Sequence, residues 1–378
     1  MIYLDNAATT FPKPTSVVRE MSECIRKYCG NPGRSSHSLS IKSAEKIYEA
    51  RELLGEIFDA EAENVVFTYN TTYALNIAIK SLLKYSTHIL ISDIEHNSVL
   101  RTVDNLASQK LCTYDIFSTS GNDDNIIENI KDKIKNNTSM IVCNHISNVG
   151  ERRLPIEKIG ELCKEKSFTF IVDAAQSAGI HHISVKEMNI DALCMPGHKG
   201  LYGPQGVGCV IFKDGVFYRS VIEGGTGINS LELKMPDFLP EAFEAGTLST
   251  PCIVGLNGAL KWLKSIGIDN IRRYEEELYN TLIQLLYSNS RIKVYKMNDY
   301  SGNTVCFNIG DIPSSVIASE LDKKGICVRS GFHCSPLGHK TLNTSDSGAV
   351  RISIGVFNTK SEIYSAFDVI NDITKNYI

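Results

Sequence analysis

Two apolar segments, each ending in a cluster of polar residues, constrain the fold of this chain more than any other feature. The first reads FTFIVDAAQS over residues 168–177, and the second reads DALCMPGHKG over residues 191–200. Such runs are typical of buried parallel strands, which present side chains at the carboxyl edge of a sheet. Asp173 and Gln176 end the first segment, and His198 and Lys199 end the second. We therefore expect these four side chains to lie close together.

An acid and a lysine displayed in this way suit the cofactor pyridoxal phosphate (PLP). The amine of Lys199 would hold the aldehyde of PLP as a Schiff base, and the carboxylate of Asp173 would pair with the protonated pyridine nitrogen. The alternative is a surface lysine and an acid at a strand end, both of which are common. The glycine-rich segment that follows Lys199 favours the cofactor.

The remaining sequence alternates between strand-like and helix-like segments from about residue 40, which predicts a mostly parallel sheet with helices on both faces. The expected helices cover residues 43–57, 72–83 and 156–166, with another from about residue 98, and the expected strands cover residues 65–69, 88–94, 140–145, 169–173 and 207–212. A helix over 255–263 should lead to a smaller domain with strands at 305–309 and 350–354 and a terminal helix at 361–373. We expect an N-terminal segment (1–15) that packs with the small domain, a large domain (16–255) and a small C-terminal domain (256–378).

Composition and charge exclude several classes of protein. The formal net charge of -4 gives no electrostatic case for binding nucleic acid or an anionic membrane. The longest apolar runs have the length of strands, far short of a membrane-spanning helix. The first ten residues, MIYLDNAATT, do not resemble a signal peptide, so we expect a cytoplasmic protein.

The cysteines predict buried thiols more than disulfides or metal ligands. The chain has 11 cysteines, an odd number, and no Cys-x-x-Cys. Most lie inside apolar runs, where a thiol behaves as a small hydrophobe. The pairs His181-His182 and His333-Cys334 are isolated from further ligands in the sequence, so we expect no metal site.

Eight sequence blocks follow one another nearly from end to end. They are YLDNAATTFPKP (3–14), GNPGRSSHSLS (30–40), NTTYALN (70–76), IEHNS (94–98), HISNVG (145–150), FEAGTLSTP (243–251), RSGFHCSP (329–336) and AVRISIGVFNT (349–359). Together they resemble the class V aminotransferase family of fold-type I PLP enzymes, and within it the cysteine desulfurase and selenocysteine lyase group, closer to the type II branch. The resemblance implies an α/β fold in which a large domain has a mostly parallel, seven-stranded type of sheet between helices, with a smaller α+β C-terminal domain.

The resemblance also implies which residues hold the phosphate of the cofactor. Thr71 and Thr72 open a helix, whose N-terminus suits a phosphate, although simple N-capping is the alternative. The family pattern assigns them to the phosphate, with His198 as a second contact. Thr247 matches a position that reaches the phosphate of the neighbouring subunit, which implies a homodimer with shared sites. Pro196 departs from the pattern, because relatives often carry Ser or Thr there.

Three further residues are assigned around the ring of the cofactor by the same resemblance. His96 would stack on the pyridine ring and handle protons, whereas without the family pattern it would be an ordinary loop histidine. Gln176 would contact the phenolic oxygen, and Asn148 would lie near that oxygen and the substrate carboxylate. The sequence after Asn148 reads GERRLP from residue 150, where relatives have a different pattern, so Arg152 or Arg153 could reshape the site.

Arg351 is the expected ligand of the substrate carboxylate. It lies in the strand-like run VRISI, and a buried arginine requires an anionic partner. A bidentate clamp on an α-carboxylate and a structural ion pair both satisfy that requirement, and the resemblance favours the clamp. Arg329 is interpreted as a structural or supporting residue.

Cys334 decides the reaction. It lies in the polar, glycine-containing loop RSGFHCSPLG, where a thiol next to His333 can ionise enough to act as a nucleophile. In desulfurases the matching cysteine takes sulfur from PLP-bound cysteine as a persulfide, and alanine is released. The loop departs from the family pattern at Phe332 and Ser335, and an unreactive thiol is the alternative.

The expected function is therefore a homodimeric, PLP-dependent cysteine desulfurase that acts on L-cysteine, with Lys199, Cys334 and His96 in catalytic roles. Selenocysteine lyase, with L-selenocysteine as substrate, is the nearest alternative, and another aminotransferase or lyase of the class is the next. A non-enzymatic alternative is a PLP-holding partner that relays sulfur in a complex. The sulfur acceptor protein, whether for iron–sulfur cluster assembly, tRNA thiolation or selenium metabolism, stays open.

Overall fold

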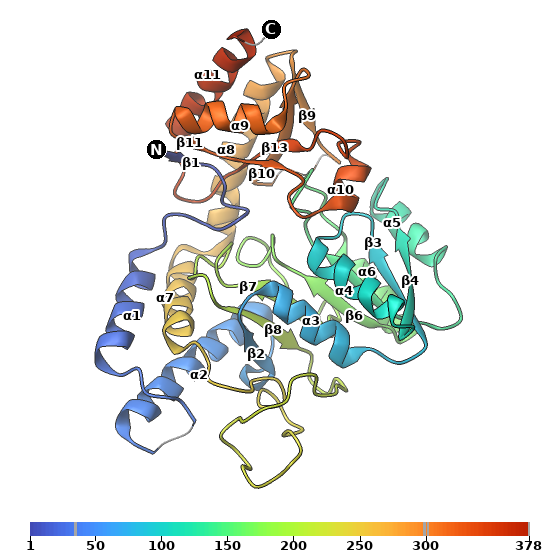
Figure 1. The fold of residues 1–378 in the computed structure, drawn as a ribbon, viewed down its shortest axis with the longest axis vertical. Helices are drawn as coiled ribbons and strands as arrows, with labels where there is room; N and C mark the ends of the chain where they lie inside the picture. The colour runs from blue at the N-terminus through green and yellow to red at the C-terminus, as the bar shows by residue number, and fades with distance from the viewer. Residues whose placement is uncertain (34–35, 298–299, 301, 377–378) are drawn as a thin grey trace.

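A seven-stranded sheet forms the lower part of the molecule in the computed structural model, which describes residues 1–33, 36–297, 300 and 302–376 (Figure 1). Residues 34 and 35 of the block at 30–40 lie outside the described residues. The strand order is β2-β8-β7-β6-β5-β3-β4. The five strands from β7 to β4 are parallel, and β8 is antiparallel to both of its neighbours. The predicted mostly parallel sheet is confirmed. The strands are β2 (Val65–Thr68), β3 (Thr87–Ser92), β4 (Cys112–Phe117), β5 (Thr138–Asn144), β6 (Thr169–Asp173), β7 (Ala192–Pro196) and β8 (Gly208–Phe212).

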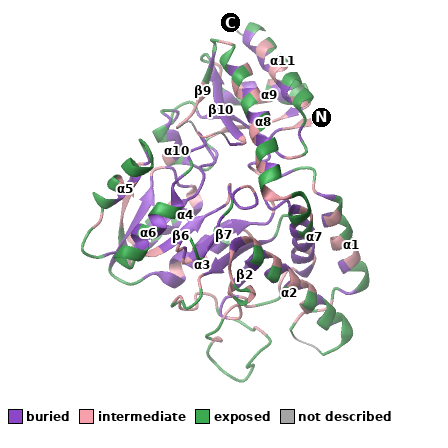
Figure 2. Cartoon of the chain, turned by 180° about the vertical axis from the view of Figure 1, so that it is seen from behind, coloured by how far each residue is buried: buried purple, intermediate pink, exposed green. Residues whose placement is uncertain are grey.

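Helices cover both faces of this sheet, because successive side chains of each strand point to opposite faces. In β6, Phe170 and Val172 pack into one core with α2, α5, α6 and α7, whereas Ile171 packs into a second core with α3 and α4. Figure 2 shows the strands buried between helices that have exposed outer sides. The helices are α1 (Thr15–Lys27), α2 (Ser38–Phe58), α3 (Thr71–Leu82), α4 (Asn97–Ser108), α5 (Asp123–Lys131), α6 (Ile156–Lys166) and α7 (Thr250–Ile266).

A second, smaller sheet lies above the first and has its own core. Its four strands are antiparallel in the order β12-β13-β10-β9, and helices α8, α9 and α11 pack against it. The N-terminal strand β1 pairs in parallel with β11 of this part. The elements are β1 (Ile2–Tyr3), α8 (Ile268–Tyr287), β9 (Ile292–Tyr295), β10 (Thr304–Ile309), α9 (Ser314–Lys323), β11 (Ile326–Cys327), β12 (Arg329–Gly331), α10 (Pro336–Thr341), β13 (Ala349–Ser353) and α11 (Lys360–Asn376).

Two helices begin earlier than the hydrophobic pattern predicts. Helix α2 begins at Ser38 instead of residue 43, because His37 caps it through a hydrogen bond from the Ser40 amide to Nδ1 of His37 (3.3 Å). Helix α7 begins at Thr250 instead of residue 255, and Pro251 lies in its first turn, where a proline is tolerated. The apolar residues of α7 pack into the core of the large sheet. We therefore propose that the domain boundary lies at Gly267, between α7 and α8.

None of the helices among the described residues is long and apolar enough to cross a membrane.

Candidate active site

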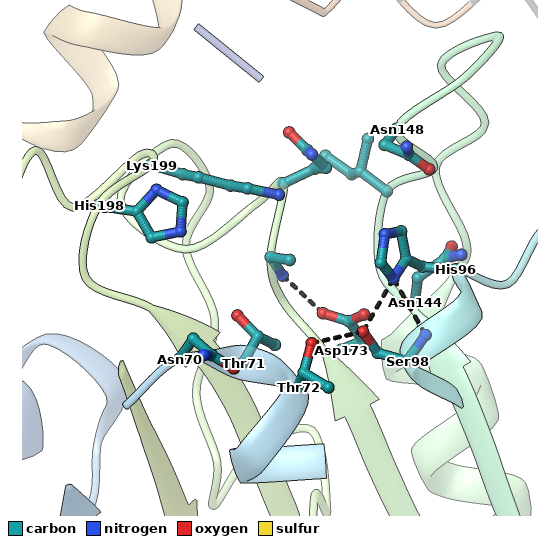
Figure 3. A pocket seen from close by; sticks show the side chains of 13 residues that line it. Asn70, Thr71, Thr72, His96, Ser98, Asn144, Asn148, Asp173, His198 and Lys199 are labelled. Atoms are coloured by element: carbon teal, nitrogen blue, oxygen red, sulfur yellow. Dashed lines mark hydrogen bonds between the residues drawn. The ribbon is translucent and has the colours of Figure 1, made fainter. Parts of the chain in front are cut away.

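A cavity of about 320 Å³ opens at the carboxyl edge of the large sheet (Figure 3). Its walls come from the segments that follow β2, β3, β5, β6 and β7, as is usual for ligand sites of parallel sheets. Eight of the nine residues expected to bind the cofactor line it, and Thr247 does not. The lining residues are Asn70, Thr71, Thr72, His96, Ser98, Asn144, Ile146, Asn148, Asp173, Ala175, Gln176, His198 and Lys199.

Asp173 and Lys199 are the acid and the amine in the wall of the cavity. Asp173 is buried at the end of β6, and its Oδ1 accepts a hydrogen bond from the Ala175 amide (2.9 Å). Burial raises the pKa of Asp173 to about 6, and the Ala175 amide and Lys199 oppose that rise. Burial likewise lowers the pKa of Lys199 to about 8, against the attraction of Asp173. Near neutral pH the carboxyl is therefore mostly ionised, and a minor fraction of the amine, roughly a tenth, is neutral.

The N-terminus of α3 forms a second wall. Asn70 caps the helix by accepting a hydrogen bond from the Tyr73 amide at its Oδ1 (3.1 Å), and Thr71 and Thr72 are the first helical residues. Strand β8 runs directly beneath, because a Cβ at Gly208 would lie 2.8 Å from the carbonyl carbon of Asn70. Within the described chain, Nδ1 of His198 is buried without a hydrogen-bond partner. The first turn of α3 therefore offers backbone N–H groups to an anion, and Nδ1 of His198 adds a donor in the tautomer in which it carries the ring proton.

His96 is the N-cap of α4 and is held in one orientation. Its Nδ1 accepts a hydrogen bond from the Ser98 amide (3.1 Å) and lies 2.9 Å from Oγ of Ser98, which in turn lies 2.8 Å from Oγ1 of Thr72. Burial, followed by the charges of Lys199 and Arg329, lowers the pKa of His96 to about 4. The imidazole is therefore neutral near neutral pH, and its Nε2 carries the proton.

Two amide side chains connect the cavity to other parts of the molecule. Nδ2 of Asn148 donates to the carbonyl oxygen of His333 (2.8 Å), in the loop that carries Cys334. Nε2 of Gln176 donates to the carbonyl oxygen of Ala7 (3.1 Å), in the N-terminal segment. Both residues keep polar atoms for a ligand while they hold segments that are distant in the sequence.

Cys334 is exposed at the edge of this site, on a loop between β12 and α10. The loop reverses direction through positive φ angles at Gly331, His333 and Cys334 (96°, 50° and 56°). The amide of Asn97 donates to the carbonyl oxygen of Cys334 (2.8 Å), so the loop is docked beside His96. Nη2 of Arg329 lies 4.0 Å from the Cys334 sulfur.

His333 does not have the role that its position in the sequence suggests. It is buried, its Nδ1 lies 3.0 Å from Nε2 of His339, and Nδ1 of His339 lies 2.7 Å from Oγ1 of Thr344. Burial, followed by the charge of Arg351, lowers the pKa of His333 to about 2. The expectation that this imidazole ionises the neighbouring thiol is therefore wrong, and the charged group next to the sulfur is Arg329. Nothing in the sequence pattern marks His339 as its partner.

Arg351 lies deep in β13 and forms the ion pair that the structural alternative expected. It is 1% exposed, and its Nη2 lies 2.9 Å from Oδ1 of Asp5. Its Nη1 donates to the carbonyl oxygen of Asn148 (3.4 Å), and its Nε is buried without a partner among the described residues. The guanidinium is therefore adjacent to the cavity but is not part of its wall.

The remaining sequence predictions fall outside the cavity. Thr247 is exposed in a separate groove beside Tyr69 and Tyr73. Arg152 is buried and directs its Nη2 to the carbonyl oxygen of Gly121, and Arg153 lies over the ring of Tyr300. Both arginines of the GERRLP segment therefore make contacts outside the cavity.

Glu95 is a buried carboxyl beneath the site that the sequence pattern did not single out. Its Oε1 accepts hydrogen bonds from the hydroxyl of Ser92 and from the amide of Asn144 (2.9 Å), and its Oε2 has no partner among the described residues. Burial raises the pKa of Glu95 to about 8, and the negative charge of Asp173 adds to the rise. In the sequence, Glu95 stands between the end of β3 and His96, and this position was the available indication that it lies near the site.

These features define a fold-type I α/β protein, and the chain belongs to the aminotransferase class-V family, which it matches over residues 2–365. It is similar to a probable cysteine desulfurase of Methanothermobacter thermautotrophicus, with 31% identity over 98% of this chain and 94% of the relative. It is also similar to the cysteine desulfurase IscS of Clostridium botulinum, with 32% identity over 99% and 94%.

Solved structures agree with this assignment. The apo structure of a cysteine desulfurase from Thermococcus onnurineus NA1 has a TM-score of 0.90 and 30% identity over 99% of this chain and 95% of that one. The cysteine desulfurase CsdA from Escherichia coli, at 23% identity, has a TM-score of 0.88 over 100% of this chain and 95% of that one, which shows the shared fold.

Proposed function

We propose that this protein is a PLP-dependent cysteine desulfurase. In the reaction, L-cysteine and the thiol of Cys334 give L-alanine and a persulfide on Cys334. One observation carries the proposal: the loop of an exposed cysteine is docked, through the Asn97 amide, beside a cavity that is lined by a buried acid and a lysine. The names of the relatives support the same reading.

The cavity residues fit PLP. The phosphate would bind at the N-terminus of α3, where it would contact Thr71 and Thr72, and also at the unpartnered Nδ1 of His198. Asp173 would face the ring nitrogen. His96 would lie on the ring, and Gln176 and Asn148 would contact its phenolic side. When bound, PLP supplies an electron sink for breaking bonds at the carbons of an amino acid.

Lys199 is the residue that moves protons. Its lowered pKa leaves a fraction of Nζ neutral near neutral pH, which is the form that can bond to an aldehyde or take a proton. The same amine, once protonated, can return a proton to Cα or Cβ of the amino acid. The neutral imidazole of His96 is the second group placed to hold a proton in the cavity.

Cys334 receives the sulfur. Its thiolate attacks the substrate sulfur, a sulfur–sulfur bond forms, and the bond between Cβ and sulfur breaks. The electron pair of that bond stays with Cβ, which takes a proton and becomes the methyl group of alanine, so no external oxidant or reductant is required. The guanidinium of Arg329 lies 4.0 Å from the Cys334 sulfur, at the position where the sulfur is transferred.

We further infer a homodimer, in which Thr247 reaches the phosphate of the other subunit, and a sulfur acceptor protein that discharges the persulfide. The exposure of Thr247, outside the cavity of its own chain, supports this arrangement. The 11 unpaired thiols suit the reducing cytoplasm, which we propose as its location.

The product analysis tests the reaction directly. The purified protein, loaded with PLP, is incubated with L-cysteine with and without a thiol reductant, and alanine, sulfide and keto acids are measured. We expect alanine in both samples, with sustained turnover and sulfide where the reductant discharges Cys334. Keto acid in place of alanine would indicate an aminotransferase, and no product would indicate the non-enzymatic relay.

The substrate alternative and the cofactor are tested in the same preparation. A rate with L-selenocysteine that far exceeds the rate with L-cysteine, in the presence of reductant, would favour a selenocysteine lyase. Borohydride reduction followed by peptide mapping should place the cofactor on Lys199, and Lys199→Ala should abolish the labelled peptide. A label on another lysine would contradict the assignment.

A further inference from the structure

The guanidinium of Arg351 is engaged in an ion pair with Asp5. Nη2 of Arg351 and Oδ1 of Asp5 are 2.9 Å apart, and the side chain of Arg351 is 2% exposed whereas that of Asp5 is 21% exposed. Asp5 is therefore the more exposed partner of the pair. Meanwhile Nε of Arg351 is buried and has no partner in the described chain. A buried guanidinium with an unused donor is costly unless a second acceptor reaches it.

Hydrogen bonds hold the backbone around Asp5 in place, and its side chain can rotate while the backbone stays fixed. The backbone of Asp5 forms a bridge with Ser353, and the amide of Ser353 donates to the carbonyl oxygen of Leu4 (2.7 Å). The amide of Ala7 donates to Oγ of Ser353 (2.8 Å). Rotation of the carboxylate toward solvent would therefore uncover Arg351 without displacing the segment.

The same segment also reaches the cofactor side of the site. The carbonyl oxygen of His198, next to Lys199, accepts hydrogen bonds from the amide of Thr10 (3.0 Å) and from Nζ of Lys13 (2.8 Å). The carbonyl oxygen of Ala7 accepts from Gln176 (3.1 Å). Asp5 thus belongs to a segment that is anchored to both halves of the site, which makes its position relative to Arg351 precise.

We propose that Asp5 is a positioning residue whose carboxylate occupies Arg351 in the resting protein as a stand-in for the α-carboxylate of the amino acid. The incoming carboxylate replaces Asp5, takes the free Nε together with Nη2, and restores a paired guanidinium. Asp5 therefore keeps Arg351 oriented and charged, and makes the exchange selective for a carboxylate. The inference rests on the proposed function in one respect, namely that the substrate is an amino acid.

The exchange predicts that removal of the Asp5 charge strengthens the binding of carboxylates. Propionate is a suitable probe, because it has a carboxylate and no amine that could react with PLP, and propionamide is its uncharged match. In Asp5→Asn, we expect calorimetry on the PLP-loaded protein to show propionate binding that is tighter by about tenfold or more, since one charge-assisted contact no longer competes. Propionamide binding should not change.

Two further variants separate positioning from a general structural effect. Asp5→Glu retains the charge and should bind propionate like the parent, and Asp5→Asn combined with Arg351→Gln should lose the gain. If Asp5→Asn does not fold alone, propionate and not propionamide should restore folding, because the buried guanidinium then has a partner again. Rescue by both compounds, or by neither, would contradict the proposal.

The outcomes also distinguish this inference from the proposed function. Folded Asp5→Asn with unchanged propionate affinity would overturn the exchange, even if the protein makes alanine from cysteine. Tighter propionate binding in a protein that makes no alanine would support the exchange and reject the desulfurase reaction.

Discussion

At the scale of single residues, burial sets the protonation of the site more than contacts between charges do. Burial is the largest cause of the shift for the acid Asp173, the amine Lys199 and the imidazole His96 alike. The effect raises the pKa of Asp173 and lowers the pKa of Lys199, so these two groups titrate closer to neutrality, whereas the lowered pKa of His96 keeps its imidazole neutral. The cavity is thereby ready for proton transfer near neutral pH.

Glu95 gives a measurable consequence of this burial. Its pKa is raised from 4.5 to about 8, so the folded protein binds more protons than the unfolded chain between these values. Its contribution to stability is therefore complete below about pH 4.5 and is lost as the pH rises through about 8. In Glu95→Gln, the fall in the free energy of unfolding between about pH 6 and pH 9 should be smaller by at least about 1 kcal/mol.

Urea unfolding at the two pH values measures this difference. The exposed Glu187→Gln should follow the parent protein, because its side chain is not buried. An equally steep fall in Glu95→Gln and in the parent would show that Glu95 does not carry the proton that burial assigns to it.

Sequence patterns identified the residues that end strands but not the partners that the fold brings from elsewhere. Asp173 and Lys199 were predictable because parallel strands meet at one edge of the sheet. The pairing of Arg351 with Asp5, and of His333 with His339, depends on loop geometry and on contacts across the chain that no local spacing shows. The direction in which His333 points is decided by the positive φ angles of its loop.

At the scale of elements, the site depends on how closely β8 supports the start of α3. A Cβ at Gly208 would lie 2.8–2.9 Å from backbone atoms of Asn70 and of Met195, which cannot move as a flexible side chain would. The glycine is therefore required by space, since its φ is not in the left-handed region. The bounds expected from the sequence for α3 and β8 lie within one residue of the observed bounds, but the close approach between the two elements is a tertiary feature.

Gly208→Ala tests this support. Overpacking should cost roughly 1–3 kcal/mol of stability and displace the helix N-terminus, so PLP affinity should fall by about tenfold or more. Val210→Ala, in the same strand, removes buried atoms instead of adding them, and should lose stability while keeping its PLP affinity. Equal PLP affinity in Gly208→Ala and the parent, measured by equilibrium titration, would argue against the α3 terminus as the phosphate site.

At the scale of the whole molecule, several large apolar side chains are exposed on the surface. Leu231 and Leu233 are fully exposed, and Phe217 is 90% exposed. Exposed apolar groups that gather in one region often mark a protein interface. We interpret them, with Thr247, as part of the proposed dimer interface.

The dimer prediction is tested by light scattering on the PLP-loaded protein. We expect a mass of twice the 41.8 kDa of one chain, and activity that falls on dilution together with the fraction of dimer. Leu231→Asp combined with Leu233→Asp should weaken association, because charges would be placed in an apolar interface. A monomer with full activity would show that each chain holds a complete site.

The central claim is that Cys334 accepts the sulfur, and a comparison of two exposed cysteines tests it most directly. Cys29 and Cys334 are the exposed cysteines in the part of the chain that the structure describes, so Cys29→Ser is the matched control for Cys334→Ser. Each PLP-loaded variant is mixed with L-cysteine without reductant, alanine is measured, and the cysteine peptides are analysed by mass spectrometry. We predict that the parent and Cys29→Ser carry one additional sulfur atom on Cys334 and release an equal amount of alanine. Cys334→Ser should release almost no alanine while its PLP absorbance still changes with cysteine. Alanine formation by Cys334→Ser at the parent rate would contradict the account.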